Sequence, residues 1–561
     1  MPRWPALVMP LAVGTATLVL RLLTAARGPT DWDSAQYAAG VRGFDVTHGR
    51  PQPPGYWLYV AGGRLVHAVS GLGTIHSLVL VAALASAAAA AATAVAGRDL
   101  GGTWVGLAAG AVMATCPFVW FSGSVVATYS FDALACAVLV DLAWRARPGS
   151  WHGIGAAVAL GLLAGFRPSI LQSFVLLGLI PVVAATRRLR QVVATLGAGA
   201  AALALWFVPM ALQQPGGAEA WWRATRIEAD GAAQATSVFD HAAAGATNLG
   251  TFAAYTVVAL APLAVVTLLA ALVLAVRGLG GSHSTGGHRR RPEPRPWYQR
   301  AGTILAAAIV PPMALVALVQ FAKGGYLLAY LPAATIALLL PVAATFRSVR
   351  VRAEWIWLAL ASVGVAAVVL LGAQRFLDGQ GVLPASWTSD PSVTHGLWLR
   401  QPRYQAPYAD TRSTIRQADA ADAGLAALRP ALRADADVLV LDTVDGGGNI
   451  YRNAGWALPH IRVALLLPGG VQYNELEGSL YYTRGRTAAT VAVGPPGSAL
   501  LLASPALPGL QSLVASGAAV AVPLPRPIGG YRAWRVRPGA AVLGVPVVAR
   551  AGPRPLGTGI S

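Results

Sequence analysis

Long apolar runs dominate the first two thirds of the chain. Each run approaches the ~20 residues that a helix needs to cross a bilayer, and most of them contain no Asp, Glu, Lys or Arg. The pattern predicts a mostly α-helical, polytopic membrane protein with about eleven transmembrane helices. These are expected at residues 7–24, 75–96, 103–121, 124–144, 151–166, 169–186, 191–211, 248–276, 301–321, 326–346 and 355–374.

The last third of the chain has a different pattern, in which charges, Pro and Gly interrupt shorter apolar runs. Short β-type runs alternate with helical stretches, which is typical of a small α/β domain outside the membrane. We therefore expect a transmembrane domain, 1–375, followed by an α/β domain, 376–561. Strands are predicted at 437–441, 462–467, 490–493, 499–502 and 518–522, and helices at 413–428 and 507–516.

Composition and charge agree with a membrane protein. Hydrophobic residues make up 55% of the chain and charged residues only 12%, about half the share in soluble domains. The net charge of +19 could indicate a nucleic-acid partner, but the Arg residues concentrate in alternate loops. This positive-inside pattern predicts a plasma-membrane protein with a cytoplasmic N-terminus, a cytoplasmic Arg289–Arg291 run and an extracytoplasmic C-terminal domain. The charge is thus attributed to topology, and no nucleic-acid partner is expected.

A metal site is not indicated by the sequence. The two cysteines, Cys116 and Cys136, lie inside apolar runs, and the nine histidines are scattered without metal-ligand spacing. We predict no cofactor, although a divalent metal is not excluded.

The first outer loop, residues 25–74, is long for a simple connector. Tyr37, Val41 and Phe44 have helical apolar spacing, and a second such stripe follows between residues 57 and 69. Both stripes predict helices that lie on the membrane surface with aromatic rings at headgroup level.

Two carboxylates, Asp31 and Asp33, stand at the start of this loop. A carboxylate at the membrane surface can act as a general base on an acceptor hydroxyl. Alternatively, Asp31 or Asp33 caps the helix that begins near Ser34.

The loop resembles the GT-C glycosyltransferases, in particular the protein O-mannosyltransferase and aminoarabinose transferase families. Those families show Asp-Glu-x-x-Tyr-Ala and Lys-Pro-Pro-x-x-Tyr-Trp-Leu motifs, and this chain has Asp33-x-x-x-Tyr37-Ala and Gln52-Pro-Pro-x-Tyr56-Trp-Leu. It departs from them at Ser34, where an acid is common, and at Gln52, where Lys or His is common. The resemblance implies that Asp33 is the catalytic carboxylate. Asp31 has no equally clear counterpart, and we assign it to substrate binding together with Tyr37, Gln52 and Tyr56.

Three further segments carry candidate residues at the predicted outer ends of the helices. Asp132 lies near the outer end of a span, where it is either a second catalytic carboxylate or a structural partner of Arg21 or Arg167. Arg167 either binds a phosphate through its planar fork or snorkels to the interface.

The third segment contains Lys323, the only lysine of the chain, followed by Tyr326. The predicted topology places both in an outer loop, and the segment is similar to one that lies near the lipid phosphate in the GT-C families. The resemblance therefore implies substrate binding by Lys323 and Tyr326, although an isolated loop lysine can also be merely solvated.

Together these residues predict a glycosyltransferase of the cell envelope, similar to mannosyltransferases. The resemblance implies a sugar donor linked to polyprenyl phosphate, from which a hexosyl or pentosyl group passes to an extracytoplasmic glycan, lipid or protein acceptor. A single displacement would invert the configuration at the anomeric carbon. The main alternative is a transporter or lipid-carrier flippase, which would need charged residues at mid-membrane and inverted repeats. A non-catalytic scaffold would need neither Asp33 nor Lys323.

Overall fold

The computed structural model describes most of the chain, and its described part is mainly helical. The described residues are 4–30, 32–148, 150–185, 188–237, 239, 242–280, 300–319, 323–348, 351–378, 411–434, 436–442, 453–467, 469–473, 488–528 and 530–550. Asp31, the Arg289–Arg291 run and the chain end at Ser561 lie outside them.

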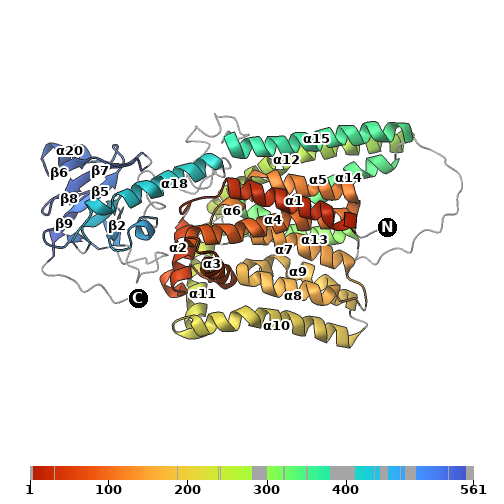
Figure 1. The fold of residues 1–561 in the computed structure, drawn as a ribbon, viewed down its shortest axis with the longest axis horizontal. Coiled ribbons are helices and arrows are strands. Elements are labelled where there is room, and N and C mark those ends of the chain that lie inside the picture. Colours follow the sequence, from red (N-terminus) through yellow and green to blue (C-terminus); the bar gives the residue numbers. More distant parts are fainter. Residues whose placement is uncertain are drawn as a thin grey trace.

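Helices occupy the apolar runs that the sequence predicted, and they pack side by side along the long axis of the molecule (Figure 1). They are α1 (Trp4–Leu23), α4 (Thr74–Gly101), α5 (Thr103–Thr115), α6 (Pro117–Ser124), α7 (Tyr129–Arg145), α8 (His152–Phe166), α9 (Ser169–Ala185), α10 (Leu189–Gln213), α12 (Ala242–Gly280), α13 (Ala301–Leu318), α14 (Leu331–Ser348) and α15 (Val351–Asp378).

Five of the described helices are long and apolar enough to cross a membrane, and the bent pair α5–α6 could be a sixth span. Other apolar helices, among them α8 and α9, are shorter than the usual spanning length. The structure thus supports a membrane protein with a mainly helical fold. The number of about eleven crossings remains a prediction.

Three of the predicted spans differ in detail from the helices that form. In the run 326–346, the first residues belong to a 3-10 helix, Gly324–Ala329, and α14 begins only at Leu331. The run 103–121 is divided into α5 and α6, which meet at 59° beside Cys116. Pro117 causes the break, because it has no N–H to continue the helix and its fixed φ suits the first position of a new one. The run 124–144 becomes helical only at Tyr129, since Val125 has extended backbone. Residues 125–128 are therefore a connection that leads into α7.

The first loop contains the two expected helices, α2 (Trp32–Arg42) and α3 (Trp57–Ser70). Their predicted role as surface helices with membrane-facing aromatics is wrong for α2, because Tyr37, Val41 and Phe44 are buried in the protein core. The reason is that α2 packs against both α3 and α4. One end of the helix bundle holds α2, α3 and α11 (Gly217–Thr236) (Figure 1).

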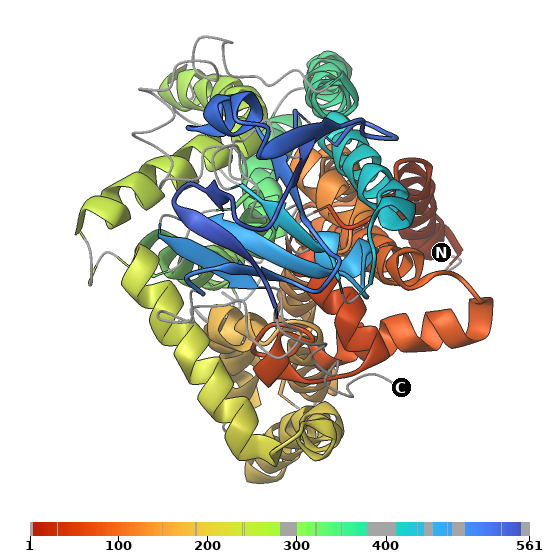
Figure 2. The ribbon, with the colours of Figure 1, turned by 90° about the vertical axis from the view of Figure 1, so that its left-hand side faces the viewer.

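The C-terminal region lies at that same end, where its sheet covers the ends of the helices (Figures 1 and 2). The predicted strands form within a residue or so of their expected bounds, and α18 (Arg412–Ala427) and α20 (Leu510–Ala515) lie where helices were expected. Four strands were not predicted. The strands are β1 (Val438–Leu441), β2 (Arg462–Leu467), β3 (Gly470–Tyr473), β4 (Val491–Val493), β5 (Ala499–Ala503), β6 (Ala519–Val522), β7 (Arg532–Val536), β8 (Ala541–Val542) and β9 (Val545–Ala549).

The larger sheet has the strand order β3-β2-β1-β5-β7-β6, and a smaller one has the order β4-β9-β8. β1 is parallel to both β2 and β5. Val438 and Val440 of β1 join one apolar cluster, whereas Leu439 and Leu441 join another. Strands that are buried on both faces in this way read as continuous apolar runs, which explains why the central strands were visible in the sequence.

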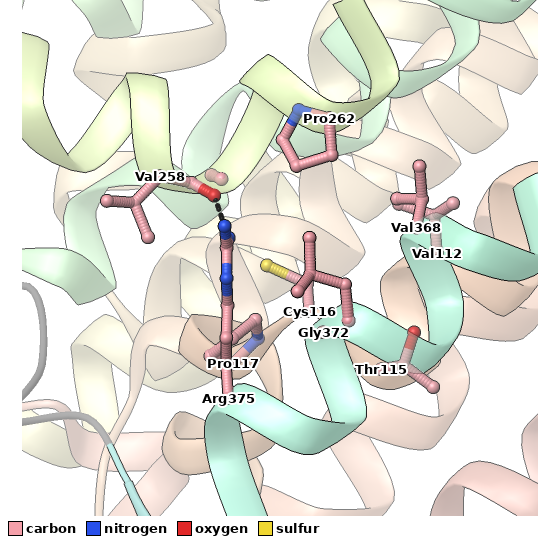
Figure 3. Close-up of a pocket in the computed structure, with 11 residues that line it drawn as sticks. Val112, Thr115, Cys116, Pro117, Val258, Pro262, Val368, Gly372 and Arg375 are labelled. Carbon is pink, nitrogen blue, oxygen red and sulfur yellow. Dashed lines mark hydrogen bonds between the residues drawn. The ribbon is translucent and has the colours of Figure 1, made fainter. Parts of the chain in front are cut away.

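A small cavity lies between α5, α6, α12 and α15, and Arg375 extends along its wall (Figure 3). The Nη1 of Arg375 donates a hydrogen bond to the carbonyl oxygen of Val258 at 2.6 Å. Pro262, four residues after Val258, has no N–H with which to reach that oxygen within the helix. Arg375 therefore satisfies a carbonyl that the proline leaves without its helical donor.

Candidate active site

Asp33 lies in the first turn of α2, where a carboxylate interacts favourably with the helix dipole. The helix begins at Trp32 rather than near Ser34, so Asp33 is inside the helix and is not its N-cap. One carboxylate oxygen, Oδ2, lies 3.9 Å from the Nζ of Lys323. Both side chains are mostly buried, with exposed fractions of 19% and 17%. The two segments that carry these residues are almost three hundred positions apart in the chain.

Asp132 and Arg167 form a second, more deeply buried ion pair. Asp132 Oδ2 lies 2.7 Å from Arg167 Nε, and the exposed fractions of the two side chains are 3% and 5%. Arg167 Nη1 also donates to the hydroxyl of Thr128 at 2.9 Å. The burial excludes a snorkelling role for Arg167. Arg21, the other partner considered for Asp132, instead donates its Nε to Ser86.

Two tyrosine rings enclose the guanidinium of Arg167. Its Cζ lies 4.3 Å from the ring centre of Tyr129 and 5.1 Å from that of Tyr326, which are distances of a cation–π contact. The rings themselves meet edge to face at 5.4 Å. Gly325 permits this approach, because a Cβ there would lie 2.4 Å from the ring of Tyr129. Arg167 is thus fixed by a carboxylate, a hydroxyl and two aromatic faces.

Tyr37 and Tyr56 continue this cluster towards α2 and α3. Their rings meet edge to face at 5.2 Å, and the Tyr37 hydroxyl lies 3.4 Å from that of Thr128. Burial raises the pKa of both phenols above the ordinary value, so both stay neutral at physiological pH. Tyr56 has a left-handed backbone with φ of 46°, which turns the chain sharply into α3.

Gln52 is buried, but no hydrogen bond described in the structure joins it to this cluster. The neighbouring turn is anchored elsewhere, since Trp221 of α11 donates its Nε1 to the Pro54 carbonyl at 2.8 Å. The predicted binding role of Gln52 stays a prediction. The predicted role of Asp31 stays a prediction, because Asp31 lies outside the described residues.

The structure thus brings together seven of the residues singled out from the sequence. We call the group they form with Thr128 and Tyr129 the outer cluster; the seven are Asp33, Tyr37, Tyr56, Asp132, Arg167, Lys323 and Tyr326. Sequence reasoning missed Thr128 and Tyr129 as members. The available signal was their position in the polar stretch that precedes Asp132.

The outer cluster combines two carboxylates with two cations in a mostly dehydrated place. Such cations can bind the oxygens of a phosphate, and Arg in particular can bind two of them at once. A carboxylate nearby can accept a proton from a hydroxyl. Among the described residues, no group of three or more His, Cys, Asp and Glu side chains could hold a metal ion.

Comparison with solved structures shows what fold surrounds this cluster. The crystal structure of ArnT from Cupriavidus metallidurans bound to undecaprenyl phosphate superposes with a TM-score of 0.52 at 13% identity, covering 99% of this chain and 100% of that one. The chain has a GT-C-type fold. ArnT is an aminoarabinose transferase, so the fold predicted from the first-loop motifs is confirmed.

Two further solved structures are similar to the chain with lower TM-scores. ArnT in the apo state gives a TM-score of 0.49 at 14% identity, covering 94% of this chain and 97% of that one. The Archaeoglobus fulgidus oligosaccharyltransferase tethered with an acceptor peptide gives 0.40 at 11% identity, covering 82% and 64%. No protein-family model and no curated protein sequence matches the chain.

Proposed function

We propose that the chain is an integral-membrane glycosyltransferase that moves a sugar from a polyprenyl-phosphate-linked donor to an extracytoplasmic acceptor hydroxyl. The observation that carries the proposal is a set of two ion pairs, Asp33–Lys323 and Asp132–Arg167, drawn from four distant segments. Tyr326 links the two pairs, because its N–H donates to the carbonyl of Lys323 and its ring lies against the guanidinium of Arg167. Charged groups are costly at membrane depth, and they are retained there mainly for function. The ArnT structure with a similar fold holds undecaprenyl phosphate, a lipid of the class that we propose as the leaving group here.

Asp33 is the general base in this proposal. Its carboxylate accepts the proton of the acceptor hydroxyl while the hydroxyl oxygen attacks the anomeric carbon. The bond from that carbon to the phosphate oxygen breaks, and polyprenyl phosphate leaves with the electron pair. A single displacement of this kind inverts the configuration at the anomeric carbon.

Arg167 and Lys323 neutralise the charge that grows on the leaving phosphate. Arg167 is held in place before the donor arrives, because Asp132, Tyr129 and Tyr326 fix its guanidinium. Such preorganisation lets a cation stabilise the transition state without reorganising. Asp132 therefore acts on Arg167 in this scheme, rather than as a second base.

The proposal is tested with the purified full-length chain in lipid nanodiscs. The protein is supplied with a panel of polyprenyl-phosphate sugars and a mixture of envelope glycans and lipids, and released polyprenyl phosphate is measured by mass spectrometry. We expect release from at least one donor, accompanied by a glycosylated acceptor. If no donor is consumed, but lipid-linked sugar crosses the bilayer of proteoliposomes, the protein is a flippase and the proposal is wrong.

A further inference from the structure

The segment that leads into Asp33 is held by the C-terminal region. We call residues 25–30, which join α1 to α2, the entry segment. Asp419 of α18 accepts two hydrogen bonds through one oxygen, Oδ1, from the backbone N–H groups of Arg27 at 2.8 Å and Gly28 at 2.9 Å. Hydrogen bonds to an ionised acceptor are among the stronger ones in proteins. The entry segment is therefore tied to α18 five and six residues before the proposed base.

A short helix at residues 453–457 adds two more contacts. Asn453 is buried and donates its Nδ2 to the carbonyl of Pro29 at 3.1 Å. The ring of Trp456 lies 4.0 Å from the guanidinium carbon of Arg42, the last residue of α2. The C-terminal region thus contacts the chain on both sides of α2, just before its start and at its end.

The entry segment and the start of α2 also contact the end of α6 and the connection that leads from it to α7. The N–H of Ala26 donates to the carbonyl of Ser124 at 2.8 Å, and Ser34 donates its hydroxyl to the carbonyl of Val126 at 3.2 Å. That connection continues directly into Thr128 and Tyr129 of the outer cluster. The start of α2 therefore lies between the polar residues of the cluster and the C-terminal region.

We propose that Asp419, Asn453 and Trp456 are positioning residues for Asp33. This inference rests on the proposed function, in which Asp33 must reach an acceptor hydroxyl while facing Lys323. Because both ends of α2 are held, its first turn cannot shift without breaking contacts to the C-terminal region. The C-terminal region then contributes to catalysis by positioning Asp33, even if it binds no substrate.

The variant that tests this most sharply is Asp419→Ala, which removes the acceptor of both backbone hydrogen bonds. Asp419→Asn is the conservative partner, because its amide oxygen can still accept them. Gln417→Ala is the matched control, since Gln417 is an exposed residue of the same helix. Trp456→Ala gives an independent perturbation at the other end of α2.

Two readouts are taken on each full-length variant: hydrogen exchange of the peptide that spans residues 25–42, and the kinetics of donor consumption. We expect faster exchange in Asp419→Ala and a kcat that is lower by about 10–10²-fold, the scale of a misplaced catalytic group. The KM for the lipid donor should stay within about twofold, because Arg167 and Lys323 are untouched. Asp419→Asn should recover most of both changes, and Gln417→Ala should match the wild type.

The outcomes separate the possible failures. Exchange that is unchanged in Asp419→Ala, or a kcat that is unchanged while exchange rises, overturns the positioning role. A rise in the KM for the acceptor at constant kcat also overturns it and assigns the region to acceptor binding. If the wild type consumes no donor, the proposed function fails, and with it the catalytic part of this inference, while the exchange data still decide whether Asp419 holds the entry segment.

Discussion

Removing the charge of Asp132 should lower the free energy of unfolding. It should also increase the amount by which polyprenyl phosphate stabilises the protein against unfolding. Asp132→Asn leaves Arg167 as an unneutralised cation that is about 95% buried. Breaking a buried ion pair by removing one partner typically costs ~3–5 kcal/mol. A lipid phosphate can supply the missing negative charge, so its binding should recover part of the loss, as any ligand of the folded state does.

The assay is the thermal unfolding of purified protein, with and without polyprenyl phosphate. The matched control is Asp141→Asn, because Asp141 pairs with Arg145 at 3.0 Å on the same helix but at a more exposed place. The loss of this pair should cost less, because Arg145 keeps a second carboxylate partner, Asp99, at 2.6 Å. If Asp132→Asn melts like the wild type, or if polyprenyl phosphate stabilises it no more than it stabilises Asp141→Asn, the assignment of Arg167 to the lipid phosphate is wrong.

Three further predictions concern Arg167, Asp422 and the membrane topology. Arg167→Lys should weaken polyprenyl-phosphate binding, measured by titration, because a lysine cannot make the paired contacts of a guanidinium. Burial, and secondly Asp419, raises the pKa of Asp422 on α18 to about 6, so ionisation of Asp422 beside Asp419 should weaken the contact between α18 and the entry segment as the pH rises through about 6. In Asp422→Asn, exchange of residues 25–30, corrected for intrinsic rates, should lose that change near pH ~6. Reporter fusions should show Ser561 outside the cytoplasm and the Arg289–Arg291 run inside; an active cytoplasmic reporter at Ser561 would contradict the topology.

The helices of the membrane part could be predicted well because a bilayer imposes a length and an apolar composition on each span. The same criterion says nothing about where a helix breaks inside an apolar run. Pro117 and the irregular residues 125–128 therefore became visible only in the structure. That break matters for the site, because it places Thr128 and Tyr129 beside Arg167.

The charged members of the outer cluster were predictable one by one, since a charge at the end of an apolar run is conspicuous. Their pairing was only partly predictable. Arg167 was one of two candidate partners for Asp132, and choosing between them required the distance in space. The two tyrosine rings around Arg167 depend on Gly325, because a Cβ at that position would lie 2.4 Å from the ring of Tyr129. No sequence pattern indicates this role of Gly325.

In the C-terminal region, some strands could be predicted from the sequence, but the contacts with the entry segment could not. The strands β1, β2 and β5 contain continuous apolar runs and were found. The strands β3, β7 and β9 contain polar residues or Pro, and β8 has only two residues; these four were not found. The contacts of Asp419 and Asn453 with the entry segment join positions some four hundred residues apart, and no local pattern announces them.

The central claim is that Asp33 performs proton transfer in sugar transfer from a lipid phosphate. The most direct measurement compares wild type and Asp33→Asn, taking both the turnover of the polyprenyl-phosphate sugar and its dissociation constant. We predict that turnover falls by ~10²–10⁴-fold, the usual contribution of a general base, while donor binding changes little because Arg167 keeps its partners. Wild-type turnover in Asp33→Asn would contradict the claim, and so would a loss of turnover that comes entirely from lost donor binding.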